Sequence, residues 1–308
     1  MGILVNIHPD MGAPIAAALR AQAPGETIWE RRDQAAPAEV EAMLAWSLKP
    51  GALAAYPNLR LLCAASAGVD KLLLPDMPAG LALVRTVDPQ QHVEIAQYVL
   101  GATLRHTREF ELLAAQQARG EWLRRPVRAA AQCRVGILGL GAVGRYVAAA
   151  VQAVGYPVAG WSRSVRQLPG VATYCGAEGL HQMLRQTDIL VCALPLTPGT
   201  RDLLNRARLS LLPQGAYVIN VGRGEQVVEP DLLELLDAGH LDGAALDVLR
   251  EEPPAVGHAL WCHPKVFGTP HIAAQASADT IARQCLDNLR RLRTGQAVRN
   301  AVDLSLGY

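Results

Sequence analysis

The feature that most constrains this chain is a glycine motif near its middle. Residues 139–144 are Gly-Leu-Gly-Ala-Val-Gly, between an apolar strand-like run and a helix-like run. In a strand-turn-helix unit, Gly139 permits the tight turn, Gly141 lets the backbone approach a pyrophosphate, and Gly144 lets the helix pack closely on the strand. Backbone amides and the helix dipole favour phosphate groups there. The motif therefore predicts a dinucleotide site. The residues predicted to contact the cofactor are Gly139, Gly141, Ala142, Val143 and Gly144.

Strand-like and helix-like segments alternate on both sides of this motif, which is typical of βαβ units and a parallel sheet. The strand-like runs are 2–7, 26–30, 42–46, 60–65, 81–86, 134–138, 156–161, 188–194, 215–221 and 242–248. Because the glycine motif lies in mid-sequence, one βα series precedes the cofactor-binding series. The predicted fold class is α/β, with two doubly wound parallel-sheet domains: a flavodoxin-like substrate domain and a Rossmann cofactor domain, with a cleft between them.

A long amphipathic helix is predicted over about 91–119, ended by Gly120 and Pro126. The residues on its apolar face are Val93, Ala96, Leu100, Leu104 and Leu112. A final helix at about 276–293 is expected to return to the first domain. The predicted domains are therefore 1–92 plus 275–308 for the substrate, and 93–274 for the dinucleotide.

Composition limits the classes of binding partner that we expect. The chain has 29 Lys and Arg against 28 Asp and Glu, a net charge of +1, so neither nucleic acid nor an anionic membrane is an expected partner. The six cysteines form no Cys-x-x-Cys pair, and we expect no metal site. No signal peptide and no apolar stretch of about 18 residues is present, so we expect a cytoplasmic protein.

The segment Ser162, Arg163, Ser164 follows the second strand of the dinucleotide unit. A site for NAD normally has an acidic residue there, which binds the ribose 2′-hydroxyl. Arg163 can instead bind a 2′-phosphate through charge-assisted hydrogen bonds. The alternative is a solvated arginine in a loop, which leaves the missing acid unexplained. We predict NADPH as cofactor, with NADH possible but weaker.

Three polar side chains follow later strand-like runs: Arg223, Glu252 and His271. A guanidinium matches a carboxylate bidentately, and an imidazole is suited to donate a proton. A carboxylate hydrogen-bonded to the imidazole favours its proton-donating form and orients the ring. Glu251 competes with Glu252 for this role, and we choose Glu252, which directly precedes Pro253. Together these groups predict a 2-keto acid reductase.

These motifs resemble the D-isomer-specific 2-hydroxyacid dehydrogenase family, and more narrowly its glyoxylate/hydroxypyruvate reductase A branch. Further resemblance lies in Ser-Ala-Gly-Val-Asp at 66–70, Trp-Ser-Arg-Ser at 161–164, Leu-Pro-Leu-Thr-Pro at 194–198 and the ending 302–308. The resemblance covers nearly the whole chain. It implies that Arg223, Glu252 and His271 are the catalytic set and that the protein is a homodimer.

The same resemblance implies roles for other residues. Ala67 and Gly68 would offer backbone amides to the substrate carboxylate, and Asp247 would lie by the nicotinamide carboxamide. Leu194 and Pro195 would line the cofactor. Trp46 matches a substrate-pocket aromatic of the branch, although a core tryptophan is nearly as good an interpretation.

Three positions depart from the family pattern: Ser66 replaces a common Gly, Leu249 a frequent Phe, and Pro254 a usual Leu. They put substrate preference in doubt more than the chemistry. The expected activity is NADPH-dependent reduction of glyoxylate to glycolate and of hydroxypyruvate to D-glycerate. The alternatives are the same chemistry on a bulkier 2-keto acid, or a non-catalytic nucleotide-sensing protein on this fold. The end of the sequence at residue 308 argues against the longer, serine-regulated phosphoglycerate dehydrogenases.

Overall fold

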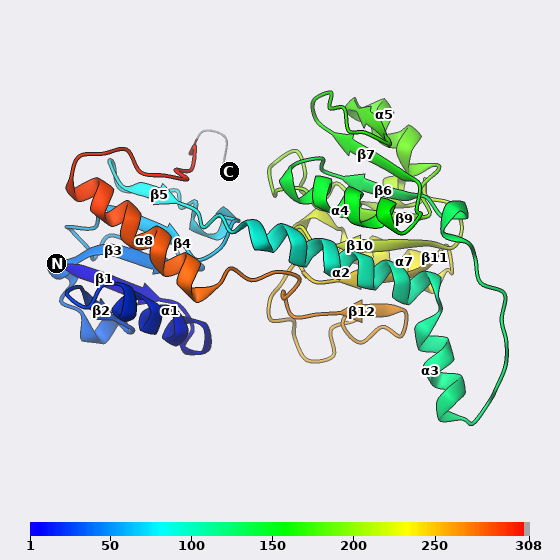
Figure 1. Cartoon of the computed structure of the whole chain (residues 1–308), viewed down its shortest axis with the longest axis horizontal. Coiled ribbons are helices and arrows are strands. Elements are labelled where there is room, and N and C mark those ends of the chain that lie inside the picture. Colours follow the sequence, from blue (N-terminus) through cyan, green and yellow to red (C-terminus); the bar gives the residue numbers. More distant parts are fainter. Residues whose placement is uncertain (305–308) are drawn as a thin grey trace. The chain divides into compact units, whose positions relative to one another are not determined.

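The structure is a computed structural model that describes residues 1–304 and divides into two compact units. Of the described residues, 1–90 and 275–304 form the first unit and 91–274 form the second (Figure 1). Each unit is built on a parallel sheet with helices, so the predicted α/β class with two parallel-sheet domains is confirmed. Of the family-like ending at 302–308, residues 305–308 lie outside the described residues.

The first unit has a five-stranded sheet in the order β2-β1-β3-β4-β5, with every neighbouring pair parallel. This is the strand order of a flavodoxin-like sheet, in agreement with the flavodoxin-like domain that the sequence predicted. Its strands are β1 (Gly2–Asn6), β2 (Thr27–Trp29), β3 (Val40–Ala45), β4 (Leu61–Ala64) and β5 (Ala82–Val84). Its helices are α1 (Pro9–Gln22) and α8 (Ala278–Arg293). These two helices, from opposite ends of the chain, share one core with the sheet, where Leu19 and Leu289 are buried with Ile3 (Figure 1).

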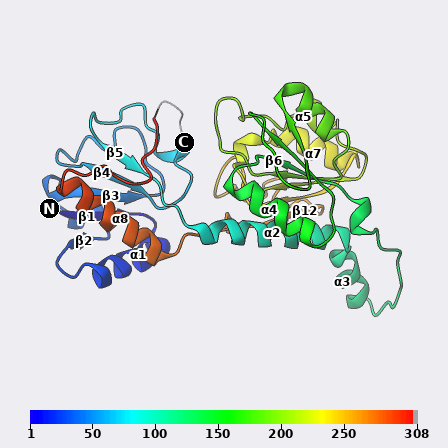
Figure 2. The ribbon, with the colours of Figure 1, turned by 45° about the horizontal axis from the view of Figure 1, so that its top comes forward.

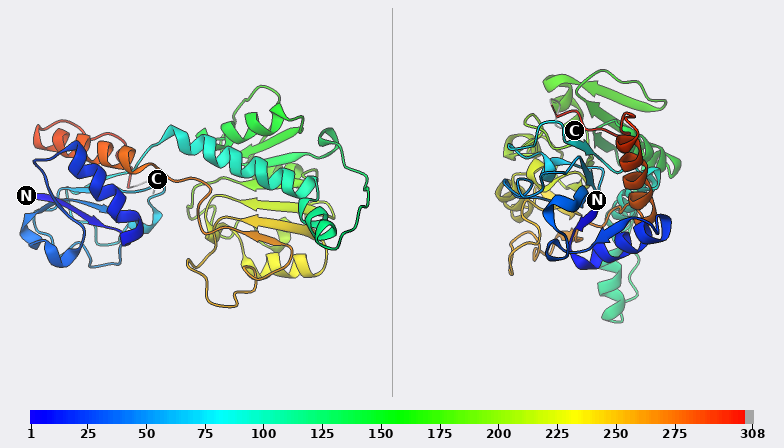
Figure 3. Two further views of the ribbon diagram at one scale, coloured as in Figure 1. Left: turned by 60° about the horizontal axis from the view of Figure 1, so that its bottom comes forward. Right: turned by 90° about the vertical axis from the view of Figure 1, so that its left-hand side faces the viewer.

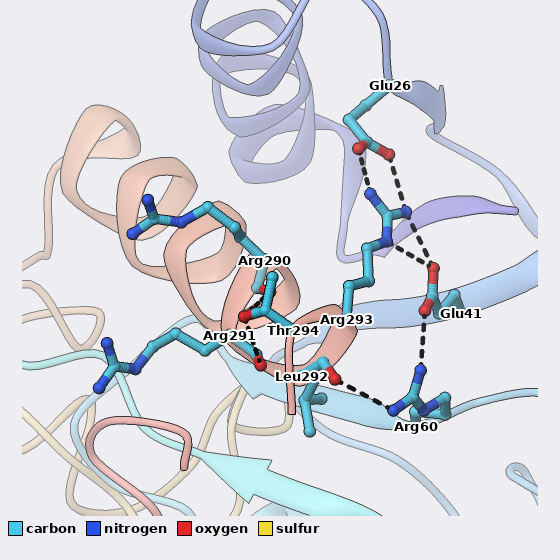
Figure 4. A network of polar contacts seen from close by, with 8 residues as sticks. All are labelled: Glu26, Glu41, Arg60, Arg290, Arg291, Leu292, Arg293 and Thr294. Atoms are coloured by element: carbon cyan, nitrogen blue, oxygen red, sulfur yellow. Dashed lines mark hydrogen bonds and ion pairs between the residues drawn. The ribbon is translucent and has the colours of Figure 1, made fainter. Parts of the chain in front are cut away.

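An ion-pair network holds the end of α8 to the first sheet (Figure 4). Arg293 contacts two carboxylates. It forms an ion pair with Glu26, and its Nε donates to Glu41 Oε2 at 3.0 Å. Arg60 approaches the other oxygen of Glu41 at 3.4 Å and donates to the carbonyl of Leu292 at 3.2 Å. Glu41 is a buried carboxylate in β3, so its two cationic partners offset the cost of removing it from water.

The second unit has a seven-stranded parallel sheet in the order β12-β11-β10-β9-β6-β7-β8. Numbered within the unit, this is the Rossmann order 3-2-1-4-5-6 with one more strand at the far edge. The strands are β6 (Val135–Leu138), β7 (Val158–Ser162), β8 (Val171–Cys175), β9 (Ile189–Cys192), β10 (Ala216–Asn220), β11 (Leu241–Leu246) and β12 (Val266–Gly268). The helices are α2 (Pro89–Thr107), α3 (Phe110–Ala118), α4 (Ala142–Ala153), α5 (Gly176–Leu184), α6 (Arg206–Leu209) and α7 (Glu229–Asp237).

Helices cover both faces of the second sheet (Figure 2). On one face α2 and α4 bury Val99 and Val147 against strand residues such as Ile137. On the other, α5 and α7 bury Leu180 and Leu232. Burial on both faces explains why these strands are nearly continuous apolar runs rather than alternating ones.

The prediction of one long helix over 91–119 is wrong, because the segment forms two helices, α2 and α3. Glu109 between them has a left-handed backbone with φ of 52°, which an α-helix of L-residues cannot continue through. After the break the apolar side chains have no sheet beneath them, so Phe110 is 51% exposed and the predicted core residue Leu112 is also exposed. Figure 3 shows α3 and the chain after it standing away from the rest of the second unit.

Of the two short edge strands of the second sheet, β8 was not predicted, and β12 was predicted only as a strand-like run before His271, without bounds. Each pairs on one side only, and neither contains a fully buried residue. Because their side chains are only partly buried, these segments carry too little hydrophobic pattern for their bounds to be predicted. Among the residues described, no helix combines the length and apolar character needed to cross a membrane.

Candidate active site

The candidate residues of the second unit lie at the carboxyl edge of its sheet. Because all its strands are parallel, their carboxyl ends meet at one edge, where open α/β sheets bind ligands. The last residues of neighbouring strands are in register: Leu138 pairs with Cys192, Cys192 with Asn220, and Asn220 with Leu246. The loops that follow these strands therefore start at a common level.

The glycine motif connects β6 to α4 in the way a dinucleotide requires. Gly139 has φ of +101°, and a Cβ there would lie 2.8 Å from the carbonyl oxygen of Ala193. A Cβ at Gly144 would lie 1.8 Å from the carbonyl oxygen of Gly139, so only glycine allows helix and strand to pack this closely. A Cβ at Gly141 would meet no described atom within 4 Å, which leaves open space in front of the helix. The motif therefore fits a pyrophosphate, with Ala142 and Val143 in the first turn of α4.

Ser162 ends β7, next to the glycine motif, since β7 pairs with β6. Its hydroxyl donates to the carbonyl oxygen of Ser164 at 2.7 Å and shapes the turn. Arg163 and Ser164 are exposed at this corner, and no carboxylate stands among these three residues. The residues present fit a 2′-phosphate better than a bare ribose hydroxyl.

Arg223 lies in a tightly held loop after β10. The Asn220 side chain accepts from the amide of Gly222 at 3.1 Å and donates to the carbonyl of Arg223 at 2.9 Å. The Arg223 guanidinium donates from Nη1 to the carbonyl of Gly222 at 2.9 Å. A Cβ at Gly224 would lie 1.9 Å from the carbonyl carbon of Leu249, so the loop has no room for a side chain there. This crowding explains the Gly-Arg-Gly pattern.

His271 and Glu252 form an imidazole–carboxylate pair. His271 Nδ1 lies 3.0 Å from Glu252 Oε2, and the two side chains are 23% and 22% exposed. The other oxygen of Glu252 accepts from the amide of Leu249 at 3.2 Å, so the carboxylate is oriented from both sides. Glu251 is exposed, so it is Glu252 that the structure places at the imidazole.

Asp247 holds the loop that carries His271. Its Oδ1 accepts from Thr269 Oγ1 at 2.6 Å and from the amide of Ile272 at 2.8 Å, and its Oδ2 accepts from the amide of Ala273 at 2.9 Å. The amide of His271 donates to the carbonyl of Asp247 at 2.9 Å. These bonds stabilise a left-handed backbone at His271, where φ is 56°. Asp247 thus orients the loop that carries the imidazole.

The candidate residues of the first unit lie at the carboxyl edge of the first sheet. Trp46 follows β3, and Ala67 and Gly68 follow β4, whose last residue pairs with that of β3. Trp46 is partly buried and packs against the apolar core, so its side chain serves that core in part. Ser66 donates to the carbonyl of Gly68 at 2.6 Å, so the departure from the family pattern adds a hydrogen bond that shapes this loop.

A hollow of about 550 Å³ lies at the amino-terminal edge of the second sheet, opposite the candidate residues. In the lining of this hollow, the Cζ atom of Arg105 lies 3.7 Å from the centroid of the Phe267 ring. The ring of His106 stacks on that of Tyr217 with 4.2 Å between the centroids. These residues lie near the starts of β10 to β12, away from the carboxyl ends. Within residues 1–304, no group of three or more His, Cys, Asp or Glu is arranged to hold a metal ion.

Comparison with known proteins settles the family. Residues 100–273, more than half of the chain, match the family of the D-isomer specific 2-hydroxyacid dehydrogenase, NAD binding domain. The chain belongs to the D-isomer specific 2-hydroxyacid dehydrogenase family. It is 37% identical over 271 residues to glyoxylate/hydroxypyruvate reductase A of Salmonella paratyphi B, covering 86% of each protein. It is 38% identical over 277 residues to the same-named protein of Serratia proteamaculans, covering 86% of this chain and 87% of the relative. The predicted family and reductase branch are confirmed.

Solved structures of this family agree over the full length. A D-isomer specific 2-hydroxyacid dehydrogenase from Xanthobacter autotrophicus Py2, in complex with NADPH and MES, has a TM-score of 0.89 at 39% identity, covering 100% of this chain and 99% of that one. The NADPH-dependent glyoxylate/hydroxypyruvate reductase of Sinorhizobium meliloti, in complex with NADP and sulfate, has a TM-score of 0.90 at 34% identity with the same coverage.

Sequence reasoning about this dehydrogenase missed several supporting residues. Gln226 and Asn220 hold the Arg223 loop, and Thr269 and Tyr98 extend the contacts of Asp247, with Tyr98 Oη 2.8 Å from Thr269 Oγ1. The one usable signal was position: Asn220 and Thr269 directly follow or end strand-like runs. Gln226 and Tyr98 carry no such signal, because their partners are distant or depend on the loop conformation.

Proposed function

We propose that this chain reduces glyoxylate to glycolate and hydroxypyruvate to D-glycerate, with NADPH as the preferred cofactor and NADH as a weaker one. The observation that carries the proposal is the pair formed by His271 and Glu252, at the sheet edge that also carries the glycine motif. Relatives named for these two substrates support the choice.

In this proposal Arg223, Glu252 and His271 are the catalytic residues. Arg223 binds the carboxylate of the keto acid through its planar guanidinium. Glu252 accepts the Nδ1–H of His271 and orients the ring, so Nε2 carries the proton to be transferred. That proton goes to the ketone oxygen as the carbonyl carbon is reduced, and the product is a 2-hydroxy acid.

The cofactor, when bound, supplies the hydride. Gly139, Gly141, Ala142, Val143 and Gly144 would hold its pyrophosphate, and Ser162, Arg163 and Ser164 its 2′-phosphate. Leu194, Pro195 and Asp247 would line the nicotinamide side. The relatives solved with NADPH or NADP support the NADPH assignment.

The first unit, predicted as 1–92 plus 275–308, is proposed to contribute the substrate loops. Ala67 and Gly68 would offer backbone amides to the substrate carboxylate, and Trp46 would border the pocket. The hydrogen bond from Ser66 to Gly68 supports a loop shape particular to this chain.

The proposal is tested by following the absorbance of NADPH and NADH with glyoxylate, hydroxypyruvate, pyruvate and phenylpyruvate. Faster oxidation of NADPH with the first two acids supports it. Turnover of a bulkier keto acid alone retains the chemistry and overturns the substrate assignment. NADPH binding without turnover of any acid would favour the nucleotide-sensing alternative.

We propose further that the protein is a cytoplasmic homodimer. Apolar side chains on and after α3 support self-association, because Trp122 is 91% exposed and Phe110 and Leu123 are also exposed. Free cysteines, two of them exposed, suit a reducing compartment. Light scattering at several concentrations tests the dimer: Trp122→Ser with Leu123→Ser is expected to shift the mass toward the monomer.

A further inference from the structure

Gln226 is a polar side chain enclosed in the second unit, with 0% exposure. Both ends of its amide are engaged. Its Oε1 accepts from the backbone amide of Arg223 at 2.9 Å and from Cys192 Sγ at 3.2 Å. Its Nε2 donates to the carbonyl oxygens of Leu194 at 2.9 Å and Pro195 at 3.1 Å. The amide therefore has one orientation in which every partner is satisfied.

These partners belong to two loops with different proposed ligands. Leu194 and Pro195 follow β9 and are assigned to the cofactor, whereas Arg223 follows β10 and is assigned to the substrate carboxylate. β9 and β10 are neighbouring parallel strands, and Gln226 lies between the loops that leave them. One side chain thus joins the cofactor loop to the backbone of the substrate-binding arginine.

The loop around Arg223 is shaped to admit this amide. A Cβ at Gly222 would lie 2.3 Å from Gln226 Oε1 and 3.0 Å from the carbonyl oxygen of Leu194. An apolar side chain of the same length in place of Gln226 would leave an amide and two carbonyls without these bonds. The loop would then relax, because buried polar groups seek other partners.

We propose that Gln226 is a positioning residue that sets Arg223 relative to the 194–195 loop, and thereby sets the keto acid relative to the nicotinamide. This inference rests on the proposed function of Arg223. It assigns Gln226 no contact with substrate or cofactor: its effect passes through the Arg223 backbone and the two carbonyls.

The first test is Gln226→Met, which keeps the length of the side chain and removes its hydrogen bonds. We expect kcat/KM for glyoxylate to fall about 10- to 100-fold, with a higher KM, because small displacements of positioned groups are costly to rate. The matched control is Asn288→Leu, since Asn288 is a buried amide of α8 bonded to Arg299, far along the chain from these loops. The control is expected to lower the melting temperature without changing kcat/KM. Equal kcat/KM in Gln226→Met and wild type would overturn the inference.

A second variant keeps the test decisive if Gln226→Met folds poorly. Gln226→Glu retains an acceptor for the Arg223 amide but turns a carboxylate oxygen toward the carbonyls of Leu194 and Pro195. Protonation of that carboxyl restores one donor. The ratio of kcat/KM for Gln226→Glu to kcat/KM for wild type should therefore rise as the pH falls. A ratio that does not change with pH would contradict the assigned geometry.

A double-mutant cycle separates this inference from the proposed function. If Gln226 acts through Arg223, adding Gln226→Met to Arg223→Ala should lower kcat/KM by less than about twofold. Full additivity would reject the positioning role while leaving Arg223 as the anchor. Unchanged turnover in Arg223→Ala alone would instead reject the proposed anchor.

Discussion

His271 Nδ1 lies 3.0 Å from Glu252 Oε2, and the second oxygen of Glu252 accepts from the backbone amide of Leu249. The carboxylate is thus held between the main chain and the imidazole, with its direction set before substrate arrives. This relationship gives the proposed proton donor a fixed ring orientation.

Loss of either member of this pair should slow turnover. We expect His271→Ala to lower kcat about 10²- to 10⁴-fold, the usual contribution of a general acid, and Glu252→Gln to lower it at least about 10-fold. The dissociation constant for NADPH, measured by fluorescence, should stay near the wild-type value in both. Glu251→Gln is the matched control, because this neighbouring carboxylate is exposed. Full activity of His271→Ala would remove it from the mechanism.

Arg163 should determine the choice between NADPH and NADH. Arg163→Ala is expected to raise KM for NADPH about 10- to 100-fold, since a charge-assisted hydrogen bond is lost, and to leave KM for NADH nearly unchanged. Arg166→Ala removes an equal charge from the same exposed loop and serves as the control. Equal losses with both cofactors would show that Arg163 does not recognise the 2′-phosphate.

Thr269 should matter through Asp247. Its hydroxyl donates to Asp247 and lies 2.8 Å from Tyr98 Oη, and burial raises the pKa of Tyr98 to about 12, so the phenol stays neutral in assays. Thr269→Val removes the donor and should lower kcat about 10-fold by loosening the His271 loop. Thr294→Val, at an exposed position, is the control. A kcat equal to that of wild type would count against this support.

Acid should destabilise the second unit partly through His106. Burial lowers the pKa of His106, against the opposing effect of Asp242, and the ring stacks on Tyr217. The unfolded chain then binds the proton more tightly than the folded chain does. The contribution of neutral His106 to the free energy of unfolding is therefore complete above about pH 6.5. It is lost as the pH falls from there toward the folded-state pKa of His106. We expect His106→Gln to show a smaller drop in urea midpoint than wild type between about pH 8 and about pH 5. An identical drop would mean that other groups dominate.

The network at the end of α8 should stabilise the first unit (Figure 4). Arg293→Met leaves Glu41 buried, with Arg60 at 3.4 Å as the remaining ion-pair partner within residues 1–304. We expect a loss of about 1–3 kcal/mol in the free energy of unfolding. Arg290→Met breaks an exposed pair with Asp287 and should have an effect too small to resolve. Similar urea midpoints for the two variants would argue against the network.

The sequence predicted the fold class well because its signals are local. Alternating strand-like and helix-like runs predicted parallel sheets, and the mid-sequence glycine motif predicted two domains. The spacing of Gly139, Gly141 and Gly144 matches the packing of β6 against α4. It failed at 91–119, where helical periodicity continues through Glu109 although the chain turns there. Periodicity reports which side chains share a face, and it cannot report whether a sheet lies beneath that face.

By itself, the sequence determined the α/β class, the dinucleotide motif, the family and the candidates Arg223, Glu252 and His271, because these depend on residue type and spacing. The tertiary structure decided how these groups are held: Glu252, the carboxylate chosen from the sequence, lies at His271, and Gln226 holds the Arg223 loop. The first outcome depends on the register of β11 and β12, the second on that of β9 and β10, and both depend on the course of the loops after these strands. Contacts between separate strands leave no periodic trace in the chain.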